Sequence, residues 1–506
     1  PGYGFLSQSS DFVDIANKNN IIFVGPSANA MLKMGSKSWS KKLMEENGEP
    51  VIKGYVGENQ DPQYLLEQAH IITFPVMIKA TMGGGGKGMR LSRNEADFMD
   101  NLKSAKNEAM TAFGNDEVII EKFIENPKHI EVQIIGDNYG NIIDLFERDC
   151  SIQRRHQKII EEAPSNLDPE IIRNIRKTAV KAAQTVNYGN AGTVEFLFDE
   201  KSKQFYFMEM NTRLQVEHPV SEMISGIDIV ELQLKIANGF SLKDFKLPEK
   251  PKGHAIEARI CAEDPFNSFL PTIGDISLFE YNNQHIINSD RTMGFDLYDN
   301  RSNIRLDFGV IENSRVTPYY DSMIGKLIVY GKDRAEAVAL LNNALQSLRV
   351  GGIQTNIPFI LNLFKNKQFI DFNYSLNYFD TYKSELLKEP QLDYTKYSIF
   401  AAVDIITSNN LREGDSLRNV RNNAVLSKQL RFSITKAFSS TETVTDLSVD
   451  ISQSEPGSKV FNVNVIDQLG NSKMTKVEIV CNNGAEIVLI IDGMIVKERI
   501  YRFGSY

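Results

Sequence analysis

Residues 193–210 read TVEFLFDEKSKQFYFMEM, and this stretch decides the fold of the region around it. Two apolar and aromatic runs flank a short polar segment, which is the pattern of a β-hairpin. If the turn centres near residue 202, Glu195 lies opposite Glu209 on the neighbouring strand. Directly opposed side chains lie about 5 Å apart, and like charges there are destabilising. We therefore expect a divalent cation between the two carboxylates, and hard oxygen ligands suit Mg²⁺.

The residues after the hairpin continue its polar face. If the chain stays extended, alternate positions carry that face through Asn211, Arg213, Gln215 and Glu217. The row then offers amides, a guanidinium and a third carboxylate beside the metal pair. The alternative is a solvated polar face on an edge strand.

A second signal is the glycine cluster TMGGGGKG at 81–88. Successive glycines expose backbone N–H groups and let the chain approach phosphate oxygens closely. The strand-like residues that follow argue against a Rossmann turn, and Gly88 after Lys87 argues against a Walker loop. A strand-loop-strand flap over a polyphosphate remains, with Lys79 as the phosphate partner. The alternative is a flexible hairpin tip.

Two further basic features need an explanation. The run RRHQK at 154–158 could meet phosphates or an anionic substrate, although short basic runs are usually solvated. Arg259 lies in the otherwise apolar segment HAIEAR (254–259), where a buried charge needs a partner. Glu257, on the same face of that strand, is the simplest candidate for this partner.

Periodicity predicts a mixed α/β chain of several parts. Residues 1–50 contain an apolar strand at 21–24 and a helix over 36–46. In 51–123, strands at 74–80, 89–93 and 117–120 surround a helix over 95–113 that Asn94 caps. Residues 124–388 form one large domain without a Gly/Ser-rich linker. Residues 395–506 predict a small antiparallel β-barrel or meander around an apolar helix at 397–408.

Composition restricts the class of protein. The chain has 506 residues, 42% hydrophobic, and its 56 basic against 65 acidic residues give a net charge of −9. Collagen-like, coiled-coil and disordered classes are excluded, and neither nucleic-acid nor membrane binding is expected. Three scattered cysteines favour a reducing compartment over a disulfide framework. Residue 1 is Pro, and no targeting peptide is visible, so the sequence reads as starting inside a domain.

Four motifs in one collinear order identify a resemblance. From residue 1 to about 388, the chain resembles the biotin carboxylase branch of the ATP-grasp enzymes. The motifs are Lys79 with the glycine loop, RRHQKIIEEAP at 154–164, EMNTRLQVEHP at 209–219 and EARICAED at 257–264. The segment GYVGENQ at 54–60 and the closing sheet-and-helix region of the chain are most similar to methylcrotonoyl-CoA carboxylase α subunits. Those subunits take part in leucine degradation in mitochondria.

The resemblance implies that ATP and bicarbonate form carboxyphosphate, which carboxylates biotin. The residues that it places around ATP are Lys37, Lys79, Gly84, Gly85, Gly86, Glu121, Lys122, Ile124, His129, Gln153 and His156. It gives Mg or Mn to Glu195, Glu209 and Asn211, and bicarbonate to Arg213, Gln215 and Val216. Glu217 would be the general base, Lys158 would contact anionic intermediates, Arg259 would stabilise the biotin enolate, and Tyr3 would flank the biotin ring.

The same resemblance implies partners and leaves alternatives. No Met-Lys-Met biotin-attachment sequence occurs in the chain, so the biotin would be on a separate carrier domain. Residues 395–506 resemble the segment that contacts a carboxyltransferase β subunit in a hetero-oligomer, here expected in the mitochondrial matrix. They could also be a linker domain. The alternatives are the α subunit of a propionyl-CoA or acetyl-CoA carboxylase, an ATP-grasp ligase that does not use biotin, or a nucleotide-binding assembly subunit.

Overall fold

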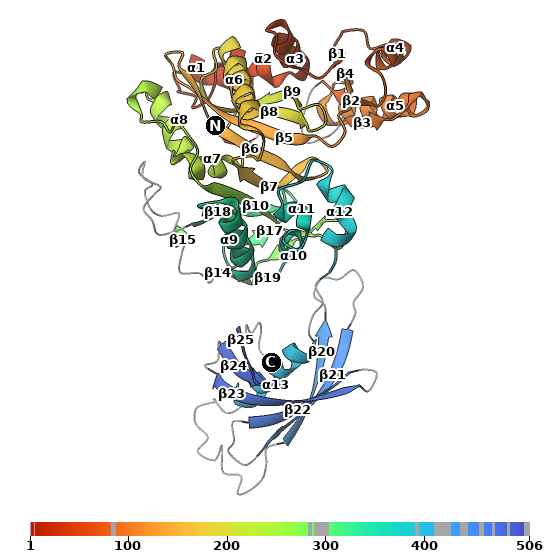
Figure 1. Ribbon diagram of the computed structural model, residues 1–506, viewed down its shortest axis with the longest axis vertical. Coiled ribbons are helices and arrows are strands. Elements are labelled where there is room, and N and C mark those ends of the chain that lie inside the picture. Colours follow the sequence, from red (N-terminus) through yellow and green to blue (C-terminus); the bar gives the residue numbers. More distant parts are fainter. Residues whose placement is uncertain are drawn as a thin grey trace. The chain divides into compact units, whose positions relative to one another are not determined.

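The structure is a computed structural model of the 506-residue chain. It describes residues 2–4, 6–81, 88–281, 286–287, 303–389, 394–408, 427–435, 444–454, 460–467, 471–482 and 486–499. The chain divides into two compact units (Figure 1). Unit 1 comprises Pro1–Glu263 and Pro271–Lys388, and unit 2 comprises Asp264–Leu270 and Glu389–Tyr506.

A nine-stranded, largely antiparallel sheet forms the centre of unit 1. Its strand order is β15-β16-β18-β10-β7-β6-β5-β8-β9. The strands are β5 (Lys128–Gly136), β6 (Ile142–Arg154), β7 (Gln157–Ala163), β8 (Asn190–Asp199), β9 (Gln204–Asn211), β10 (His254–Cys261), β15 (Ile286–Ile287), β16 (Ile304–Phe308) and β18 (Met323–Gly331). The predicted mixture of helices and strands in this region is confirmed.

Period-2 alternation sends neighbouring residues of this sheet into different cores. Ile134 of β5 packs into a cluster with helix α6 (Pro169–Thr185), α2 (Ala28–Gly35) and α3 (Lys37–Glu46). The next residue, Ile135, joins a second cluster with α8 (Ile229–Ala237). Helices therefore cover both faces of the sheet (Figure 1).

The predicted hairpin is β8–β9, and the predicted pairing of Glu195 with Glu209 is confirmed. Glu195 pairs with Glu209, and a β-bulge follows directly, so Phe196 pairs with Phe207. Phe196 is fully buried and makes edge-to-face contacts with Phe205 and Phe207. The aromatic residues thus anchor one face of the hairpin, which leaves its polar residues on the other face.

A smaller four-stranded sheet, with strand order β1-β4-β2-β3, lies within unit 1. Its elements are β1 (Gly54–Tyr55), β2 (Val76–Ala80), β3 (Met89–Ser92), β4 (Val118–Lys122), α4 (Pro62–Ile72) and α5 (Glu95–Phe113). Helix α5 matches the prediction at both ends. Asn94 and Asp97 form a capping box, and Gly114 closes the helix in the left-handed conformation. The glycine flap, 82–87, lies outside the described residues.

Unit 1 contains eleven further described elements. They are α1 (Ser10–Lys18), α7 (His218–Ser225), η1 (Leu242–Asp244), β13 (Gly274–Asp275), β14 (Leu278–Tyr281), β17 (Arg315–Val316), α9 (Arg334–Ser347), β19 (Leu348–Gly351), α10 (Ile357–Leu363), α11 (Lys367–Ile370) and α12 (Tyr378–Leu386). Two short strands, β11 (Glu263–Asp264) and β12 (Leu270–Pro271), each contain one residue of unit 1 and one of unit 2. The predicted strand at 21–24 is wrong: no described segment pairs with it, and Ile21 and Ile22 are exposed.

Unit 2 contains one helix and a six-stranded antiparallel meander among its described residues. They are α13 (Tyr394–Ser408), β20 (Ser427–Thr435), β21 (Val444–Gln453), β22 (Val460–Ile466), β23 (Ser472–Asn482), β24 (Glu486–Ile491) and β25 (Met494–Arg499). Each strand pairs with its neighbour in sequence, and no described pairing joins β25 to β20. Of the two predicted forms, barrel or meander, the described strands form the meander, and Ile399, Phe400 and Val403 of α13 pack against its apolar residues.

Within the described part of the chain, no helix combines the length and the apolar character that a membrane span requires.

We predict that Phe196→Ala lowers the free energy of unfolding of unit 1 by about 3–5 kcal/mol, because it leaves a cavity among packed rings. Urea unfolding, followed by the fluorescence of the single tryptophan, Trp39 in α3, measures the change. Ile311→Ala is the control, since Ile311 is 72% exposed and its loss should change stability by less than about 0.5 kcal/mol. Equal losses in both variants would contradict the packing argument.

Candidate active site

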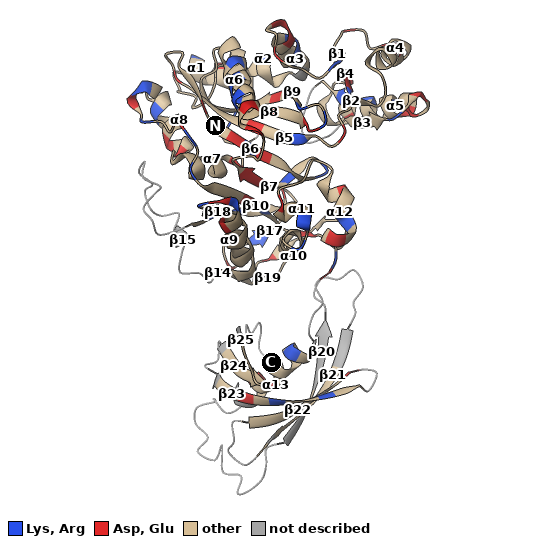
Figure 2. Ribbon diagram, viewed as in Figure 1, with Lys and Arg blue, Asp and Glu red and all other residues tan. Residues whose placement is uncertain are grey.

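Neighbouring strands of the large sheet place charged side chains on one face. Across β8, β5 and β6, Glu131 pairs in register with Glu195 on one side and with Arg148 on the other. Directly paired residues share a face, and the flanking residues Ile130 and Val132 point into the apolar core. Charged residues therefore lie on the strands of this sheet as well as on the helices that cover it (Figure 2).

Lys158 of β7 is the centre of this charged face. Its Nζ lies 2.5 Å from Glu131 and 3.3 Å from Glu195, and it also contacts Glu217. Burial alone would lower the pKa of this ammonium, but the three carboxylates raise it well above its usual value. Lys158 therefore stays charged and offsets part of the negative charge around it.

Glu217 is held from two sides. Arg259 Nη2 donates to Glu217 at 2.9 Å, and Lys158 contacts the other carboxylate oxygen. Burial would raise the pKa of the Glu217 carboxyl, but Lys158, Arg259 and Arg148 together hold it well below its usual range. Glu217 is therefore an ionised carboxylate in a site from which water is largely excluded.

The prediction for the partner of Arg259 is wrong. Glu257 does not pair with it; Arg259 Nε donates to Glu161 at 2.5 Å and Nη2 donates to Glu217. Arg259 points across the sheet to β7, whereas Glu257 lies near Lys326 of β18. Glu257 is thus not the partner of Arg259, because the guanidinium extends toward Glu161 on the adjacent strand β7.

The sequence predicted that the polar row continues as an extended strand, and this prediction is wrong. Strand β9 ends at Asn211, and Glu217 is already the residue before helix α7. Asn211 Nδ2 and Gln215 Nε2 nevertheless donate to Glu195 Oε1 at 2.9 and 2.7 Å. A loop therefore gathers these side chains, whereas Arg213 turns toward Gln8 and Asn211.

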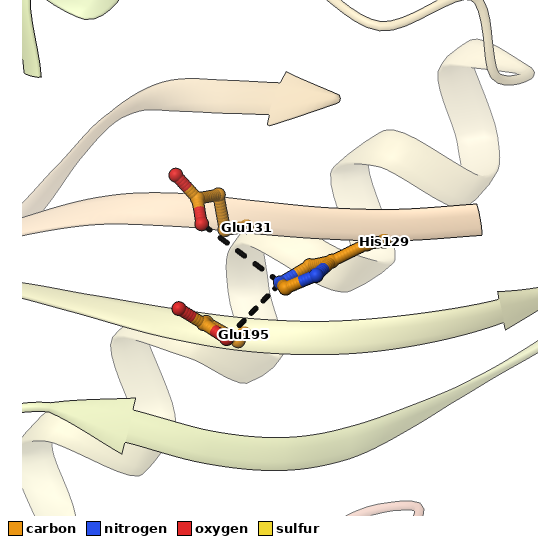
Figure 3. Close-up of side chains that lie close together, drawn as sticks. All are labelled: His129, Glu131 and Glu195. Carbon is orange, nitrogen blue, oxygen red and sulfur yellow. Dashed lines mark ion pairs between the residues drawn. The ribbon is translucent and has the colours of Figure 1, made fainter. Parts of the chain in front are cut away.

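A group of potential metal ligands lies beside Lys158. His129, Glu131 and Glu195 have ligand atoms within 4.8 Å of one another, and all three are buried (Figure 3). His129 Nε2 lies 3.0 Å from Glu195, while its Nδ1 faces the Gln153 amide at 2.8 Å. With Glu209 directly across the hairpin from Glu195, the oxygen-rich donor set fits a divalent cation such as Mg²⁺ or Mn²⁺. His129 and Glu131 were not among the predicted metal ligands.

Of the residues expected near the nucleotide, Glu121 and Lys79 contact each other, whereas Lys122 lies apart from them. The Glu121 carboxylate forms ion pairs with the Nζ atoms of Lys79 at 2.5 Å and Lys41 at 2.9 Å. Burial would raise the pKa of Glu121, but Lys79 and Lys41 lower it to about 2. Lys122 turns away and donates to the backbone carbonyls of Thr73 and Phe74.

The other predicted positions are placed as follows. His156 is exposed in the β6–β7 hairpin turn, where it and Arg155 have φ of 65° and 48°, as in a type I′ turn. Ile124 is half-buried just past β4, Val216 is buried in the loop after β9, and Tyr3 is 52% exposed. Lys37 begins α3, and the described contacts do not include its side chain. Gly84, Gly85 and Gly86 lie outside the described residues.

Sequence reasoning missed Arg148, whose side chain has five described hydrogen-bond partners. Arg148 is fully buried and donates to Glu131 at 2.5 Å and to Gln215 at 3.1 Å. It also reaches Gln133, Ser221 and Thr193. The available signal was the charged triplet ERD at 147–149 inside an apolar strand, since buried charges need partners.

Comparison with known proteins agrees with this architecture. The carbamoyl-phosphate synthase L chain ATP-binding domain matches residues 36–245, and the biotin carboxylase N-terminal and C-terminal domains match 1–31 and 257–381. Methylcrotonoyl-CoA carboxylase subunit alpha of Rattus norvegicus is 46% identical over 388 residues, which are 76% of this chain and 52% of that protein. Biotin carboxylase 1 of Bacillus subtilis is 44% identical over 383 residues, 76% of this chain and 81% of that protein.

A solved structure is also similar. The biotin carboxylase–β-γ-ATP complex from Campylobacter jejuni has a TM-score of 0.69 and 46% identity, and the match covers 75% of this chain and 81% of that one. Fold and site together define an ATP-grasp enzyme. The chain belongs to the biotin carboxylase family. It spans about half the length of the methylcrotonoyl-CoA carboxylase relative that it matches.

We predict that Glu121→Gln destabilises unit 1 by about 3–5 kcal/mol at pH 7, because it leaves two buried ammonium groups without a counter-charge. The lowered pKa of about 2 means that the ionised Glu121 stabilises the fold above pH 4.5. This stabilisation is lost as the pH falls from 4.5 toward 2. The difference between wild type and variant should therefore narrow over that range in urea titrations. A difference that does not vary with pH would contradict the pairing.

Proposed function

We propose that this chain uses ATP and bicarbonate to carboxylate the ureido nitrogen of biotin on a carrier domain. One observation carries the proposal: a buried, ionised Glu217 lies between Lys158 and Arg259, next to the Glu195–Glu209 pair. A general base must be unprotonated at the working pH and within reach of the proton that it takes. Membership of the biotin carboxylase family supports the same reaction.

In the proposed mechanism, Arg213, Gln215 and Val216 bind bicarbonate beside Glu217. Glu217 takes the bicarbonate proton, and a carbonate oxygen then attacks the γ-phosphorus of ATP, which releases ADP and leaves carboxyphosphate. Lys158 balances the anionic charge, and Arg259 stabilises the biotin enolate. The carboxyphosphate would give its carboxyl group to the ureido nitrogen of biotin and release phosphate, and this phosphate would take the proton that the nitrogen loses. Positioning and charge neutralisation in a water-poor site supply most of the rate enhancement.

The remaining predicted residues have supporting roles in the proposal. Glu195 and Glu209, assisted by Asn211, would hold Mg²⁺ or Mn²⁺, which neutralises phosphate charge when bound. The glycine flap would cover the phosphates, and Tyr3 would flank the biotin ring. The residues proposed to contact ATP are Lys37, Lys79, Glu121, Lys122, Ile124, His129, Gln153 and His156.

We propose more specifically that the chain acts as the α subunit of a methylcrotonoyl-CoA carboxylase in the mitochondrial matrix. The rat relative supports this assignment, whereas the Bacillus subtilis relative carries only the general name. In this proposal, residues 395–506 contact a carboxyltransferase β subunit, and residues 1–50, 51–123 and 124–388 are the three parts of the carboxylase core.

We predict that Glu217→Gln lowers kcat for bicarbonate- and biotin-dependent ATP cleavage by roughly 10²–10⁴-fold, the usual contribution of a general base. Arg259→Ala should abolish the stimulation by biotin. ADP release by the full chain with free biotin measures both effects. Glu231→Gln is the matched control, because Glu231 pairs only with Lys235 on helix α8 among the contacts described and should leave the rate unchanged.

The assay also tests the alternatives. Wild-type rates in Glu217→Gln would contradict the assignment of the base. Stimulation by ammonia or an amino acid, with none by biotin, would favour an ATP-grasp ligase that does not use biotin.

We predict that the assembled carboxylase turns over methylcrotonoyl-CoA faster than propionyl-CoA or acetyl-CoA. The physical reason is that the partner subunit, which would bind the acyl group, discriminates by pocket shape. Incorporation of labelled bicarbonate into each acyl-CoA, with a streptavidin blot for the carrier, measures the preference. A preference for propionyl-CoA or acetyl-CoA would overturn the specific assignment and leave biotin carboxylation intact.

A further inference from the structure

The loop between β9 and α7 carries Gln215 and Glu217, and two of its consecutive backbone carbonyls are held by buried side chains. Lys326 Nζ donates to the carbonyl of Val216. His218 Nδ1 lies 2.9 Å from the carbonyl of Gln215 and must donate, because a carbonyl can only accept. Burial, with Lys326 nearby, lowers the pKa of His218 well below its usual value, so the ring is neutral. The loop is thus fixed by its main chain as well as by its side chains.

Lys326 lies on β18, directly across from Arg259 of β10. Its side chain is 5% exposed, and its nearest acidic oxygens are those of Asp307 at 3.8 Å and Glu257 at 4.0 Å. Both separations exceed hydrogen-bond distance. The one short contact of this buried ammonium, among those that the structure describes, is therefore the Val216 carbonyl. A buried charge is costly unless it is paired and hydrogen-bonded, so this placement needs a reason.

Glu257 is a buried acid beside Lys326 that does not form a hydrogen bond with its ammonium group. Its carboxylate is fully buried, and within the described chain neither oxygen has a hydrogen-bond partner. Glu161 lies directly opposite it across β7–β10, so two acids face each other. Burial raises the pKa of Glu257 well above its usual value, although Lys326 opposes this. Glu257 lies 4.0 Å from Lys326 without a hydrogen bond to it, so the Val216 carbonyl remains the short contact of the ammonium.

We propose that Lys326 is a positioning residue for the reaction. Arg259 and Lys326, side by side on adjacent strands, hold the carboxylate of Glu217 and the carbonyl of the residue before it. Two anchors on successive residues fix the direction in which the base points and the place of the Val216 backbone. This inference rests on the proposed function, because it assigns bicarbonate to the same loop. It predicts that loss of Lys326 affects bicarbonate and leaves nucleotide binding unchanged.

The test is Lys326→Met in the full chain, assayed by bicarbonate-dependent ADP release with free biotin. Loss of a hydrogen bond to a charged group should raise the bicarbonate KM by roughly ten- to a hundredfold. The KM for ATP should stay within about twofold of wild type, since none of the described contacts of Lys326 involves a residue proposed to bind nucleotide. A purely structural role would instead lower the apparent kcat through the loss of folded protein and leave both KM values unchanged.

A double variant distinguishes the loss of the hydrogen bond to the Val216 carbonyl from the loss of the cation beside Glu257. Lys326→Met leaves Glu257 without its nearest cation, so the single variant should be less thermally stable. Lys326→Met combined with Glu257→Leu removes this buried carboxyl and should recover stability. The bicarbonate KM should stay raised in the double variant, because the Val216 carbonyl still lacks its donor. If the single variant fails to fold, the double variant carries the test.

Arg334→Met is the matched control for removing a buried cation. Arg334 of α9 bonds to Glu162 and to the carbonyls of Ile370 and Phe369, and has no described contact with the loop. It should lower the unfolding temperature without changing the bicarbonate KM.

The outcomes are distinguishable. A bicarbonate KM within twofold of wild type in the single variant, or restored in the double variant, would overturn the role of Lys326. Absence of bicarbonate-dependent activity in the wild-type chain would instead overturn the proposed function itself.

Discussion

The contact between Lys158 and three buried carboxylates is the constraint on which the rest of the site depends. Glu131, Glu195 and Glu217 converge on one ammonium in a region nearly without solvent. If no cation lay among carboxylates this close, their mutual repulsion would raise their pKa values and some of them would be protonated. With Lys158 present, and with Arg148 and Arg259 outside it, Glu195 and Glu217 both have lowered pKa values. An ionised carboxylate can therefore exist inside a sheet.

The sheet supplies the geometry because its register is set by packing elsewhere. Apolar residues of β5 and β8, such as Val132 and Val194, lock those strands onto α6. Because side chains alternate, a one-residue slip would move Glu131 and Glu195 into that apolar core. The free energy of apolar packing on one face thus fixes the relative positions of the charges on the other. Rigid elements hold reacting groups more accurately than loops do.

Sequence alone could predict local features of this site and few of its long-range partners. The Glu195–Glu209 pairing followed from a period of two and one turn, and α5 followed from its cap. The path after Asn211 was wrong because strand pairing stops there, and alternation cannot indicate where a neighbour ends. Arg259 was matched to the nearest acid in sequence, whereas its partners come from β7 and from the loop. Arg148 was missed for the same reason.

The failed extension past Asn211 also explains why the site needs buried donors beneath its loop. A strand has its carbonyls satisfied by the next strand, but residues 212–217 have left the sheet and must find donors elsewhere. His218 and Lys326 supply them at two adjacent carbonyls. A neutral donor and a cation suffice there because the carbonyls carry no net charge, so Lys326 does not compete with Lys158 for Glu217. Separate cations thus hold the main chain and the carboxylate of one loop.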